Sequence, residues 1–357
     1  MKNKLLIAML LASISLSACG NGANKEAPKE ESAQTEQQAQ PEEAAKDENK
    51  EDAKDTASDS DTVKIKDLTG EVEVKKNPKK VVALDNRTFE TLEEWGITPV
   101  AAPKPIMPAT SGFVKNDEIQ DIGNHKEPNL EVIAAADPDL IIVGQRFGKY
   151  TEELKKLCPN ADVIDLNWDV SDKAANPGEN LVNGLKDSLE SLGKIFDKED
   201  EAKALIEKLD KSISEAKEAY KEGTVMSVVV SGGEIGYSAP GFGRVWGPLY
   251  EILGLKPAIE VENSSTDHKG DDISVEAIAQ SNPAYLLVLD RDAAVTKEGE
   301  ESTPAKDVIE GSEALKSTDA IKNSKVYYAP ADTYTNESPQ TFIKIFEGLK
   351  ELFSKKV

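Results

Sequence analysis

Cysteine and histidine are scarce in this sequence, which has two of each among its 357 residues. Cys19 follows an apolar segment near the N-terminus, which leaves Cys158 as the one cysteine in the rest of the sequence. Cys158 precedes Pro159 in a leucine-rich context, where a cysteine usually behaves as a small buried hydrophobe. His125 and His268 alone provide little for acid–base catalysis or for binding a bare divalent transition metal.

Catalytic motifs are missing as well. The sequence has no Gly-x-Ser-x-Gly elbow and no phosphate-binding loop with its lysine. The glycines of SGGEIGYSAPGFG do not have the spacing of a dinucleotide-binding loop. We therefore expect a protein that is not an enzyme and that carries no intrinsic cofactor.

Positive charge is in deficit, because 43 basic residues face 66 acidic ones and the formal net charge is −23. Part of the excess lies in Gly20–Asp61, which has thirteen acidic and five basic residues and no aromatic residue, valine, isoleucine, leucine or methionine. Such a segment cannot bury enough apolar surface to fold, so residues 19–61 are predicted to be a disordered acidic tether. The negative charge argues against nucleic acid as a partner and against electrostatic attachment to anionic lipid.

The N-terminus has the pattern of a secretory signal. Lys2 and Lys4 precede the apolar segment Leu5–Leu16, which is shorter than the roughly 20 apolar residues that cross a bilayer. The next residues, Leu16-Ser17-Ala18-Cys19, resemble a bacterial lipobox, which implies a signal peptide over residues 1–18 and a lipid on Cys19. The protein would then be anchored to a membrane without spanning it. The alternative is an ordinary signal peptide with an incidental cysteine.

One pattern occurs twice in the chain, 145 residues apart. LEVIAAADPDLIIVGQR, from Leu130 to Arg146, aligns without a gap with VEAIAQSNPAYLLVLDR, from Val275 to Arg291. Each copy predicts a short amphipathic helix, which must end before its proline, and then a buried parallel strand followed by an arginine. A second, weaker repeat supports two similar lobes: LEEWGITP, from Leu92 to Pro99, resembles YEILGLKP, from Tyr250 to Pro257. Because ligands of open α/β sheets bind at the carboxyl ends of the strands, one arginine from each lobe is expected to face a cleft.

The remaining pattern completes an α/β fold with two lobes. Val81–Leu84 and Val163–Leu166 are predicted strands of an N-terminal lobe over residues 62–196, and Phe89–Trp95 is a predicted helix. A helix capped by Asp197 is predicted over residues 199–222 and is about 36 Å long, enough to join the lobes. We assign residues 197–222 to this interlobe helix and residues 223–357 to a C-terminal lobe. The alternative is a surface helix within one lobe.

Arginine is used sparingly, at four positions among the 43 basic residues: Arg87, Arg146, Arg244 and Arg291. Each follows a predicted strand or lies in the glycine-rich loop after one, where a cleft is expected. Guanidinium is planar, permanently charged and able to stack on aromatic rings, which suits an aromatic anion with many oxygens. The alternative for any one of them is a salt bridge that fastens a loop.

With its lipobox, two lobes and paired DPDLIIVGQR and NPAYLLVLDR motifs, the chain resembles the substrate-binding lipoproteins of iron-siderophore ABC importers, in the group that binds ferric catecholates. The resemblance covers residues from about Val63 to the end. It implies mainly parallel sheets flanked by helices, joined by one long backbone helix, and it assigns Arg146 and Arg291 to the ligand. Arg244 is the third expected ligand arginine, although relatives place it directly before an aromatic-Gly pair and here Val245 intervenes. Three arginines would balance a ferric tris-catecholate, which carries three negative charges.

The same resemblance suggests further site residues. His268 and Tyr334 fall where some members have a histidine and a tyrosine that ligate iron when the siderophore leaves two positions open, and both residue types can complete a ferric octahedron. Trp168 is expected to present a ring face to a catechol. Glu131 and Glu276, at equivalent places in the repeats, are expected to dock on arginines of the permease. The alternatives are a solvated loop histidine, a tyrosine at a loop end, a core tryptophan and two solvated carboxylates.

The resemblance thus implies a monomeric receptor, lipid-anchored on the outer face of the cytoplasmic membrane of a Gram-positive cell. It would carry ferric iron as a siderophore complex to an ABC permease. Two other functions stay open: a receptor for haem or a corrinoid, for which three arginines are excessive, and a surface lipoprotein that binds host protein. Visible absorption distinguishes them, because ferric catecholates, haem and cobalamin have different spectra and an interaction protein has no coloured ligand.

Overall fold

The apolar runs of the repeat form central strands of two sheets in a computed structural model, which describes residues 61–262, 264–296 and 300–355. The expected signal peptide (1–18), Cys19 and the tether up to residue 60 lie outside the described residues. Within the described part of the chain, no helix has the length and apolar content of a membrane span.

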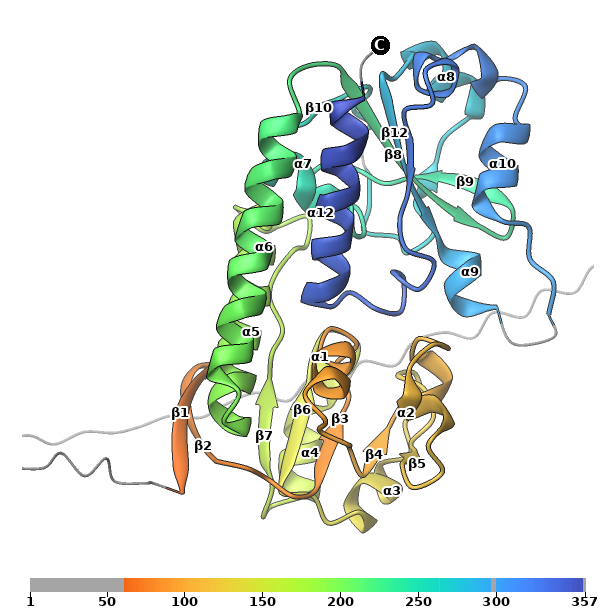
Figure 1. Cartoon of the computed structure of the whole chain (residues 1–357). Helices are drawn as coiled ribbons and strands as arrows, with labels where there is room; N and C mark the ends of the chain where they lie inside the picture. Colours follow the sequence, from red (N-terminus) through yellow and green to blue (C-terminus); the bar gives the residue numbers. More distant parts are fainter. Residues whose placement is uncertain (1–60, 263, 297–299, 356–357) are drawn as a thin grey trace, which may run out of the picture. The chain divides into compact units, whose positions relative to one another are not determined.

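The N-terminal lobe is built on a five-stranded sheet in which every pairing is parallel (Figure 1). The strand order is β5-β4-β3-β6-β7, so the chain starts in the middle and winds outward in both directions. Its strands are β3 Val81–Ala83, β4 Ala101–Ala102, β5 Gln120–Asp121, β6 Leu140–Val143 and β7 Asp162–Asp165. Its helices are α1 Phe89–Glu94, α2 Gly112–Lys115, α3 Leu130–Ala135 and α4 Thr151–Leu157, with 3₁₀ turns η1 Lys104–Ile106 and η2 Gly148–Tyr150.

An antiparallel hairpin that the sequence analysis did not predict precedes this sheet. It consists of β1 Thr62–Asp67 and β2 Gly70–Lys75. Ile65 and Val74 turn inward from it and belong to the core of the N-terminal lobe, whereas most of its other side chains are at least partly exposed.

The C-terminal lobe has a six-stranded sheet with the path β11-β9-β8-β12-β13, and β10 also pairs with β8. Strands β8, β10, β12 and β13 are parallel, and β9 runs antiparallel to both of its neighbours, β8 and β11. The strands are β8 Thr224–Ser231, β9 Glu234–Tyr237, β10 Lys256–Pro257, β11 Asp271–Asp272, β12 Tyr285–Asp290 and β13 Val326–Tyr328. The helices are α7 Gly247–Leu253, α8 Val275–Ser281, α9 Arg291–Val295, α10 Ala305–Gly311, α11 Asp319–Lys322 and α12 Pro339–Ser354, with the 3₁₀ turn η3 Leu315–Ser317.

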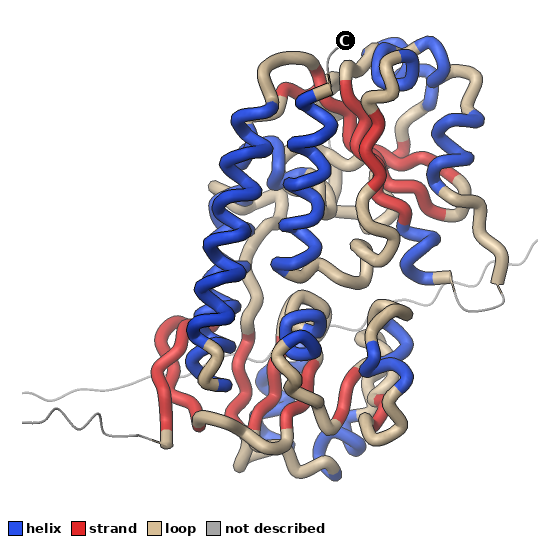
Figure 2. The backbone as a smooth tube through the Cα atoms, in the orientation of Figure 1, coloured by secondary structure: helices blue, strands red, loops and turns tan. Residues whose placement is uncertain are grey.

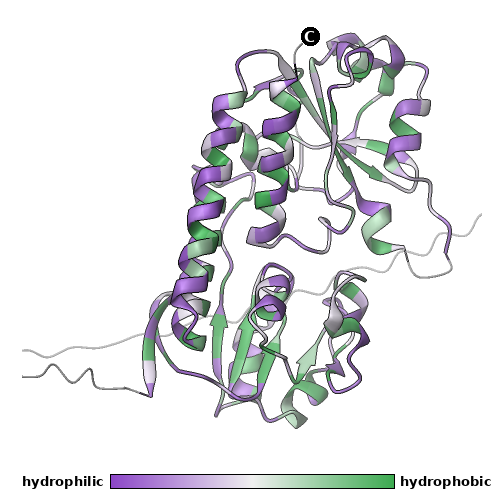
Figure 3. Cartoon of the chain, viewed as in Figure 1, coloured by the Kyte–Doolittle hydropathy of each residue, from purple (hydrophilic) through white to green (hydrophobic). Residues whose placement is uncertain are grey.

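Side chains of the central strands alternate between two apolar layers, which makes each lobe a three-layer sandwich. In β3, Val81 and Ala83 belong to the core on one face, and Val82 packs in the core on the other face. In β8, Val225 and Val229 belong to the core on one face of the sheet, and Val228 belongs to the core on the other face. Figure 3 shows the apolar colour concentrated on these strands and on one side of each long helix. Helices therefore cover both faces of each sheet, as the continuous apolar runs predict.

The turns between helix and strand in the repeat are equivalent in both lobes. Asp137 and Asn282, each directly before its proline, have φ of 49° and 44°. Asp and Asn tolerate this left-handed region better than most residues, and there they end the helices α3 and α8. Gly96 and Gly254 likewise have φ of 74° and 67° after α1 and α7. The weaker repeat, LEEWGITP and YEILGLKP, therefore also has the same backbone conformation in both lobes.

Two long helices, not one, lie between the lobes (Figure 2). The predicted helix is α6, Glu199–Ala219, and it is preceded by α5, Pro177–Phe196, which the sequence analysis did not predict. Asp197 does not cap α6, because it adopts φ 52° and ends α5, and Lys198 is the N-cap of α6. Helix α6 also ends earlier than predicted, with Tyr220 as its C-cap.

The chain passes between the lobes three times. After β7, Trp168 and Val170 already pack against the core of the C-terminal lobe, and α5 begins there, where Gly178 N–H donates to Glu251 of α7 at 2.8 Å. Helix α5 returns to the N-terminal lobe, where Ile195 O accepts from Asn77 N at 2.7 Å. Helix α6 then runs back and packs against α12.

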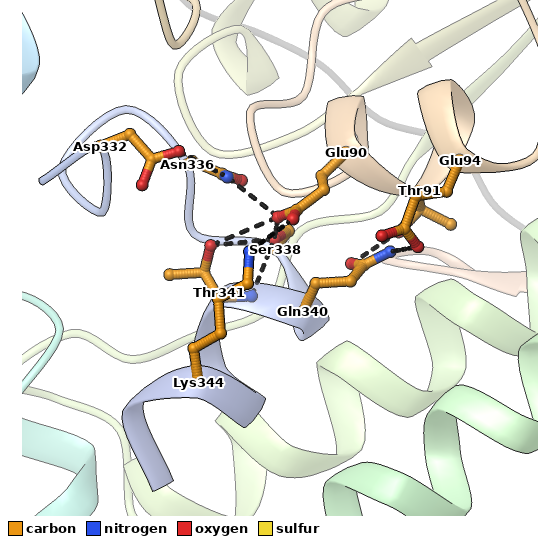
Figure 4. A network of polar contacts seen from close by, with 9 residues as sticks. All are labelled: Glu90, Thr91, Glu94, Asp332, Asn336, Ser338, Gln340, Thr341 and Lys344. Atoms are coloured by element: carbon orange, nitrogen blue, oxygen red, sulfur yellow. Dashed lines mark hydrogen bonds and ion pairs between the residues drawn. The ribbon is translucent and has the colours of Figure 1, made fainter. Parts of the chain in front are cut away.

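The lobes also meet directly through a polar network between α1 and the start of α12 (Figure 4). Glu90 Oε2 accepts hydrogen bonds from Ser338 Oγ at 2.5 Å and from Asn336 Nδ2 at 2.9 Å, and Glu90 Oε1 pairs with Lys344 Nζ at 2.8 Å. One turn along α1, Glu94 Oε2 accepts from Gln340 Nε2 at 2.8 Å. This network, which we call the Glu90 latch, is a second connection between the lobes.

Candidate ligand-binding cleft

The winding of the two sheets determines where the predicted arginines lie. In the N-terminal lobe the topology reverses between the neighbouring strands β3 and β6, and their carboxyl ends are followed by Arg87 and Arg146. A crevice at such a reversal is the usual ligand site of open α/β sheets. The two ends are close together, since a Cβ built on Gly144 would lie 2.2 Å from Cγ of Asp85. In the C-terminal lobe β8 and β12 are the equivalent pair, and Arg291 after β12 donates to Ser231 Oγ at the end of β8 at 3.1 Å.

Three of the four arginines converge on one aromatic ring. The guanidinium carbons of Arg244, Arg291 and Arg146 lie 4.2, 5.1 and 5.6 Å from the ring centroid of Tyr334. The Tyr334 carbonyl accepts from Arg146 Nη2 at 2.9 Å and from Arg244 Nη2 at 3.0 Å. We call these four residues the arginine cluster. It joins the lobes, because Arg146 comes from the N-terminal lobe and the other three residues come from the C-terminal lobe.

The arginine cluster is electrostatically strained. Burial and the like charge of Arg244 lower the pKa of Arg146, while the carboxylate of Glu337 opposes this effect. Glu337 forms an ion pair with Arg244, and only 14% and 8% of the Arg244 and Glu337 side chains are exposed. The Nε atoms of Arg244 and Arg291 are buried without a hydrogen-bond partner. Unpaired donors on crowded guanidiniums favour the binding of an anion with several oxygens.

The loop of Arg244 is distorted at the residue that departs from the family pattern. Val245 adopts φ 63°, and Trp246 N donates to Arg244 O at 2.7 Å across it, which closes a three-residue turn. A β-branched residue is a genuine outlier in this region. The intervening residue is thus absorbed by a tight turn, so that Trp246 is fully buried in the core and Arg244 reaches Tyr334. Backbone strain of this kind persists where the surroundings enforce it.

Arg87 lies apart from the arginine cluster, in a stack with Trp168. Its guanidinium carbon is 3.7 Å from the Trp168 ring centroid, and its Nη1 donates to Asn167 Oδ1 at 3.0 Å. The indole fits against α5 because Gly184 has no side chain there; a Cβ at Gly184 would lie 2.2 Å from Trp168 Cδ2. Arg87 and Trp168 line a cavity of about 330 Å³ together with Arg244, Phe242 and Glu337. Trp168 and Arg87 therefore border the same space as one member of the arginine cluster.

The two residues expected to ligate iron lie in different surroundings. Tyr334 lies at the centre of the arginine cluster and is buried. His268 is on an exposed loop, with 49% of its side chain accessible. Burial lowers the pKa of His268, Asp267 raises it, and Arg291 and Arg244 lower it further. Thr266 of the same loop lines the cavity together with Arg244. Within the described residues, no group of three or more histidine, cysteine or carboxylate side chains could hold a metal ion by itself.

The two carboxylates expected at the permease are exposed at matching positions. Glu131 and Glu276 both lie in the first turn of their helices, α3 and α8, after the capping side chains of Asn129 and Ser274. In Figure 1, α3 and α8 are at opposite ends of the folded lobes. Cys19, the expected lipidation site, lies outside the described residues.

Three polar side chains that interact with the predicted arginines were not predicted from the sequence. Glu337 pairs with Arg244, and Asp85 is fully buried behind Arg87 with Oδ2 unpaired. Burial raises the pKa of Asp85 to about 6, although Arg87 lowers it. His125, half-buried, has an unpaired Nδ1, and burial and Arg146 lower its pKa. Only Asp85 had a sequence signal, namely its place directly after a buried strand.

Comparison with known proteins is consistent with this architecture. Residues 81–333 match the family described as periplasmic binding protein. The petrobactin-binding protein YclQ of Bacillus subtilis is 30% identical over 335 residues, which cover 93% of this chain and 92% of that protein. The ferric-anguibactin-binding protein FatB of Vibrio anguillarum is 29% identical over 285 residues, covering 79% of this chain and 84% of that protein.

Solved structures of similar proteins have the same two-lobed fold. The crystal structure of YclQ matches with a TM-score of 0.68 at 28% identity and covers 83% of this chain and all of that one. The catecholate-siderophore binding protein VctP of Vibrio cholerae matches with a TM-score of 0.69 at 27% identity, covering 81% of this chain and 99% of that one. These relatives are named for what they bind and not for a reaction, in keeping with a chain that is not an enzyme. By this match along most of its folded length, the chain belongs to the periplasmic binding protein family.

Proposed function

We propose that this protein is a lipid-anchored receptor that binds a ferric catecholate siderophore in the cleft between its lobes and delivers it to an ABC permease for iron uptake. The observation that carries the proposal is the arginine cluster, in which guanidiniums from both lobes surround one tyrosine ring. Such a site offers permanent positive charge, forked donors and flat stacking surfaces, which together match a multi-oxygen aromatic anion. Relatives named for petrobactin, ferric anguibactin and catecholate siderophores support this ligand class.

Each site residue has a specific part in the proposed complex. Arg146, Arg244 and Arg291 bind the anionic oxygens, while Arg87 and Trp168 border the ligand on the side of the 330 Å³ cavity. Tyr334 and His268 ligate ferric iron when the siderophore leaves two positions open. Iron arrives and leaves as cargo within its siderophore. The lipid on Cys19 keeps the receptor on the outer face of the cytoplasmic membrane, and Glu131 and Glu276 dock on the permease.

The two other ligand hypotheses fit the cleft less well. Haem has two carboxylates on a largely apolar ring and corrinoids carry mainly neutral amides, so either would leave buried guanidiniums unpaired at a cost in free energy. A surface that binds host protein needs no buried cationic cluster. Both hypotheses make a different spectroscopic prediction from ours, since only a ferric catecholate gives a visible catecholate charge-transfer band.

The test is a titration of the purified protein with ferric catecholates, followed by quenching of tryptophan emission. We expect tight binding in the unchanged protein and a loss of at least about a hundredfold in Arg146→Ala/Arg291→Ala, because two charge-assisted contacts are removed. Lys155→Ala, a change at a lysine on the exposed side of α4, is the matched control. Binding that survives the double substitution would refute the assigned site, and no binding of any ferric catecholate would refute the ligand class.

A further inference from the structure

Glu337 places a negative charge among the arginines of the cleft. Its side chain is only 8% exposed, pairs with Arg244 and borders the 330 Å³ cavity. It acts electrostatically on Arg146 and on Arg87 as well as on Arg244. A carboxylate is an unexpected lining for a site that binds anions, because a bound anion must approach it in a desolvated environment.

Glu337 is fixed where it lies. Its neighbours on both sides, Asn336 and Ser338, donate hydrogen bonds to Glu90 of the other lobe (Figure 4). Ser338 is also the N-cap of α12 and accepts from Thr341 N at 3.1 Å. The backbone that carries Glu337 is therefore held by the Glu90 latch, so the Glu337 carboxylate remains beside the cleft even when a ligand displaces it from Arg244.

The carboxylate changes the charge that the cleft presents. The three guanidiniums around Tyr334 and the carboxylate of Glu337 together carry two positive charges. Arg87 adds little to this sum, because the carboxylate of buried Asp85 lies beside it, accepts from Arg87 N at 3.2 Å and offsets the guanidinium charge. A ligand with three negative charges would exceed the available positive charge and would displace Glu337 from Arg244, which leaves a buried carboxylate unpaired.

We infer that Glu337 is a specificity-determining residue that makes the cleft prefer ferric catecholates with fewer than three negative charges. The inference rests on the proposed function and narrows its ligand class. A complex in which two catecholates hold the iron carries one negative charge, whereas one with three catecholates carries three. The carboxylate also favours a ligand that presents a donor, such as an amide N–H, beside Arg244. Discrimination through an unfavourable charge contact is a common source of specificity.

The experiment measures two dissociation constants in the unchanged protein and in Glu337→Gln. The probes are ferric complexes of a hexadentate tris-catecholamide and of a tetradentate bis-catecholamide on the same backbone. We expect the unchanged protein to bind the bis-catecholate complex more tightly. In Glu337→Gln, the ratio of the two constants should move toward the tris-catecholate by about tenfold or more, as for the loss of one repulsive charge at a desolvated site.

Two control variants separate charge from structure. Glu337→Asp keeps the carboxylate and should leave the ratio of constants unchanged. Glu152→Gln removes one negative charge from an exposed helix position and should do the same, which excludes an effect of net charge. Circular dichroism establishes that each variant is folded.

The possible results are distinct. Equal weakening of both complexes in Glu337→Gln would mean that Glu337 only supports Arg244, and the inference would be wrong. If Glu337→Gln does not fold, a preference of the unchanged protein for the tris-catecholate complex overturns the inference by itself, and the reverse preference supports it. Failure of the unchanged protein to bind either complex would instead contradict the proposed function.

Discussion

A single tyrosine ring holds three arginines in place at the centre of the cleft. Cation–π contacts of this kind contribute about 0.5–2 kcal/mol each, more when they are shielded from water. They orient the guanidiniums of Arg146, Arg244 and Arg291, which would otherwise repel one another. The ring and its hydroxyl thus have separable roles, one in positioning the arginines and one in the proposed ligation of iron.

Tyr334→Phe separates these roles. The phenylalanine ring keeps the contacts with the guanidiniums, so we expect the free energy of unfolding to change by less than about 1 kcal/mol. If the tyrosine oxygen binds iron, the visible band of a ferric bis-catecholate complex should shift in this variant, because a phenolate ligand is lost. An unchanged spectrum on binding would show that Tyr334 does not ligate the metal.

Asp85 makes the stability of the protein depend on pH. Burial raises its pKa from the ordinary value near 4 to about 6, so between these values the folded protein binds a proton that the unfolded chain does not. The contribution of Asp85 to the free energy of unfolding therefore becomes more favourable as pH falls from about 7 to about 4, by up to roughly 3 kcal/mol. Urea denaturation of the unchanged protein and of Asp85→Asn across this range measures it. Parallel pH profiles would contradict the prediction.

At the residue scale the sequence was informative where one residue type was rare. The four arginines of the sequence could be matched to strand ends or to the loop after a strand, and three of them meet at Tyr334. Glu337 is one of 66 acidic residues and lies in a loop without periodicity, so no sequence pattern distinguished it. Its place depends on the packing of α12 against the other lobe, which is a tertiary property.

Helix α5 not only connects the lobes but also leaves the space in which the Trp168 ring lies. Glycine within a helix costs about 1 kcal/mol relative to alanine, yet Gly184 lies in the middle of α5. The absence of its Cβ leaves room for the indole that stacks on Arg87.

Gly184→Ala should displace Trp168 and unstack Arg87. We expect a shift of tryptophan emission and a weakening of siderophore binding of about tenfold, even though helix propensity improves. Gly311→Ala is the matched control, because Gly311 lies in helix α10 with open space where the Cβ would be. Unchanged emission and affinity in Gly184→Ala would mean that the indole does not depend on this space.

The Glu90 latch is the second element-level prediction. Glu90→Ala leaves Ser338 and Asn336 without their acceptor, which should lower the free energy of unfolding by about 1–3 kcal/mol at neutral pH. Burial raises the pKa of Glu90, but hydrogen bonds from Lys344, Ser338 and Asn336 together lower it by more, so the net shift of the pKa is downward.

The sign of this shift gives the latch a pH signature. A lowered carboxyl pKa stabilises the fold above the ordinary value and loses that effect as pH falls through the folded value. The difference between the unchanged protein and Glu90→Ala should therefore shrink below about pH 4. Glu153→Ala, at an exposed carboxylate of α4, is the control and should show no such difference.

At this scale the sequence predicted the repeated elements well. Periodicity located α6 and the strands β6 and β12, because their apolar patterns are long or occur twice. The pattern of α5 was also present, with Pro177 at its start and Leu181, Leu185, Leu189 and Leu192 on its buried face, but the sequence analysis did not identify it. The short strands β4, β5, β10 and β11 have two residues each, too few for any periodic signal.

For the whole molecule, the proposed role requires an encounter with the permease. Glu131→Lys/Glu276→Lys should abolish iron uptake in cells and leave the dissociation constant of the ferric siderophore unchanged, because both side chains are exposed and lie on short helices at the far ends of the lobes. Glu152→Lys/Glu313→Lys, a pair of exposed carboxylates elsewhere, is the control for net charge. Uptake at the normal rate in the first variant would refute the docking role.

In the described part of the chain, three passages between the lobes and the Glu90 latch hold the lobes together and resist hinge bending of the cleft. A receptor of this build presents nearly the same outline whether it is empty or loaded. Empty copies should then compete with loaded ones for the transporter, so that overproducing the receptor while siderophore is limiting slows import instead of speeding it. If the protein has the proposed function, the ratio of receptor to transporter in the membrane is then a determinant of iron supply.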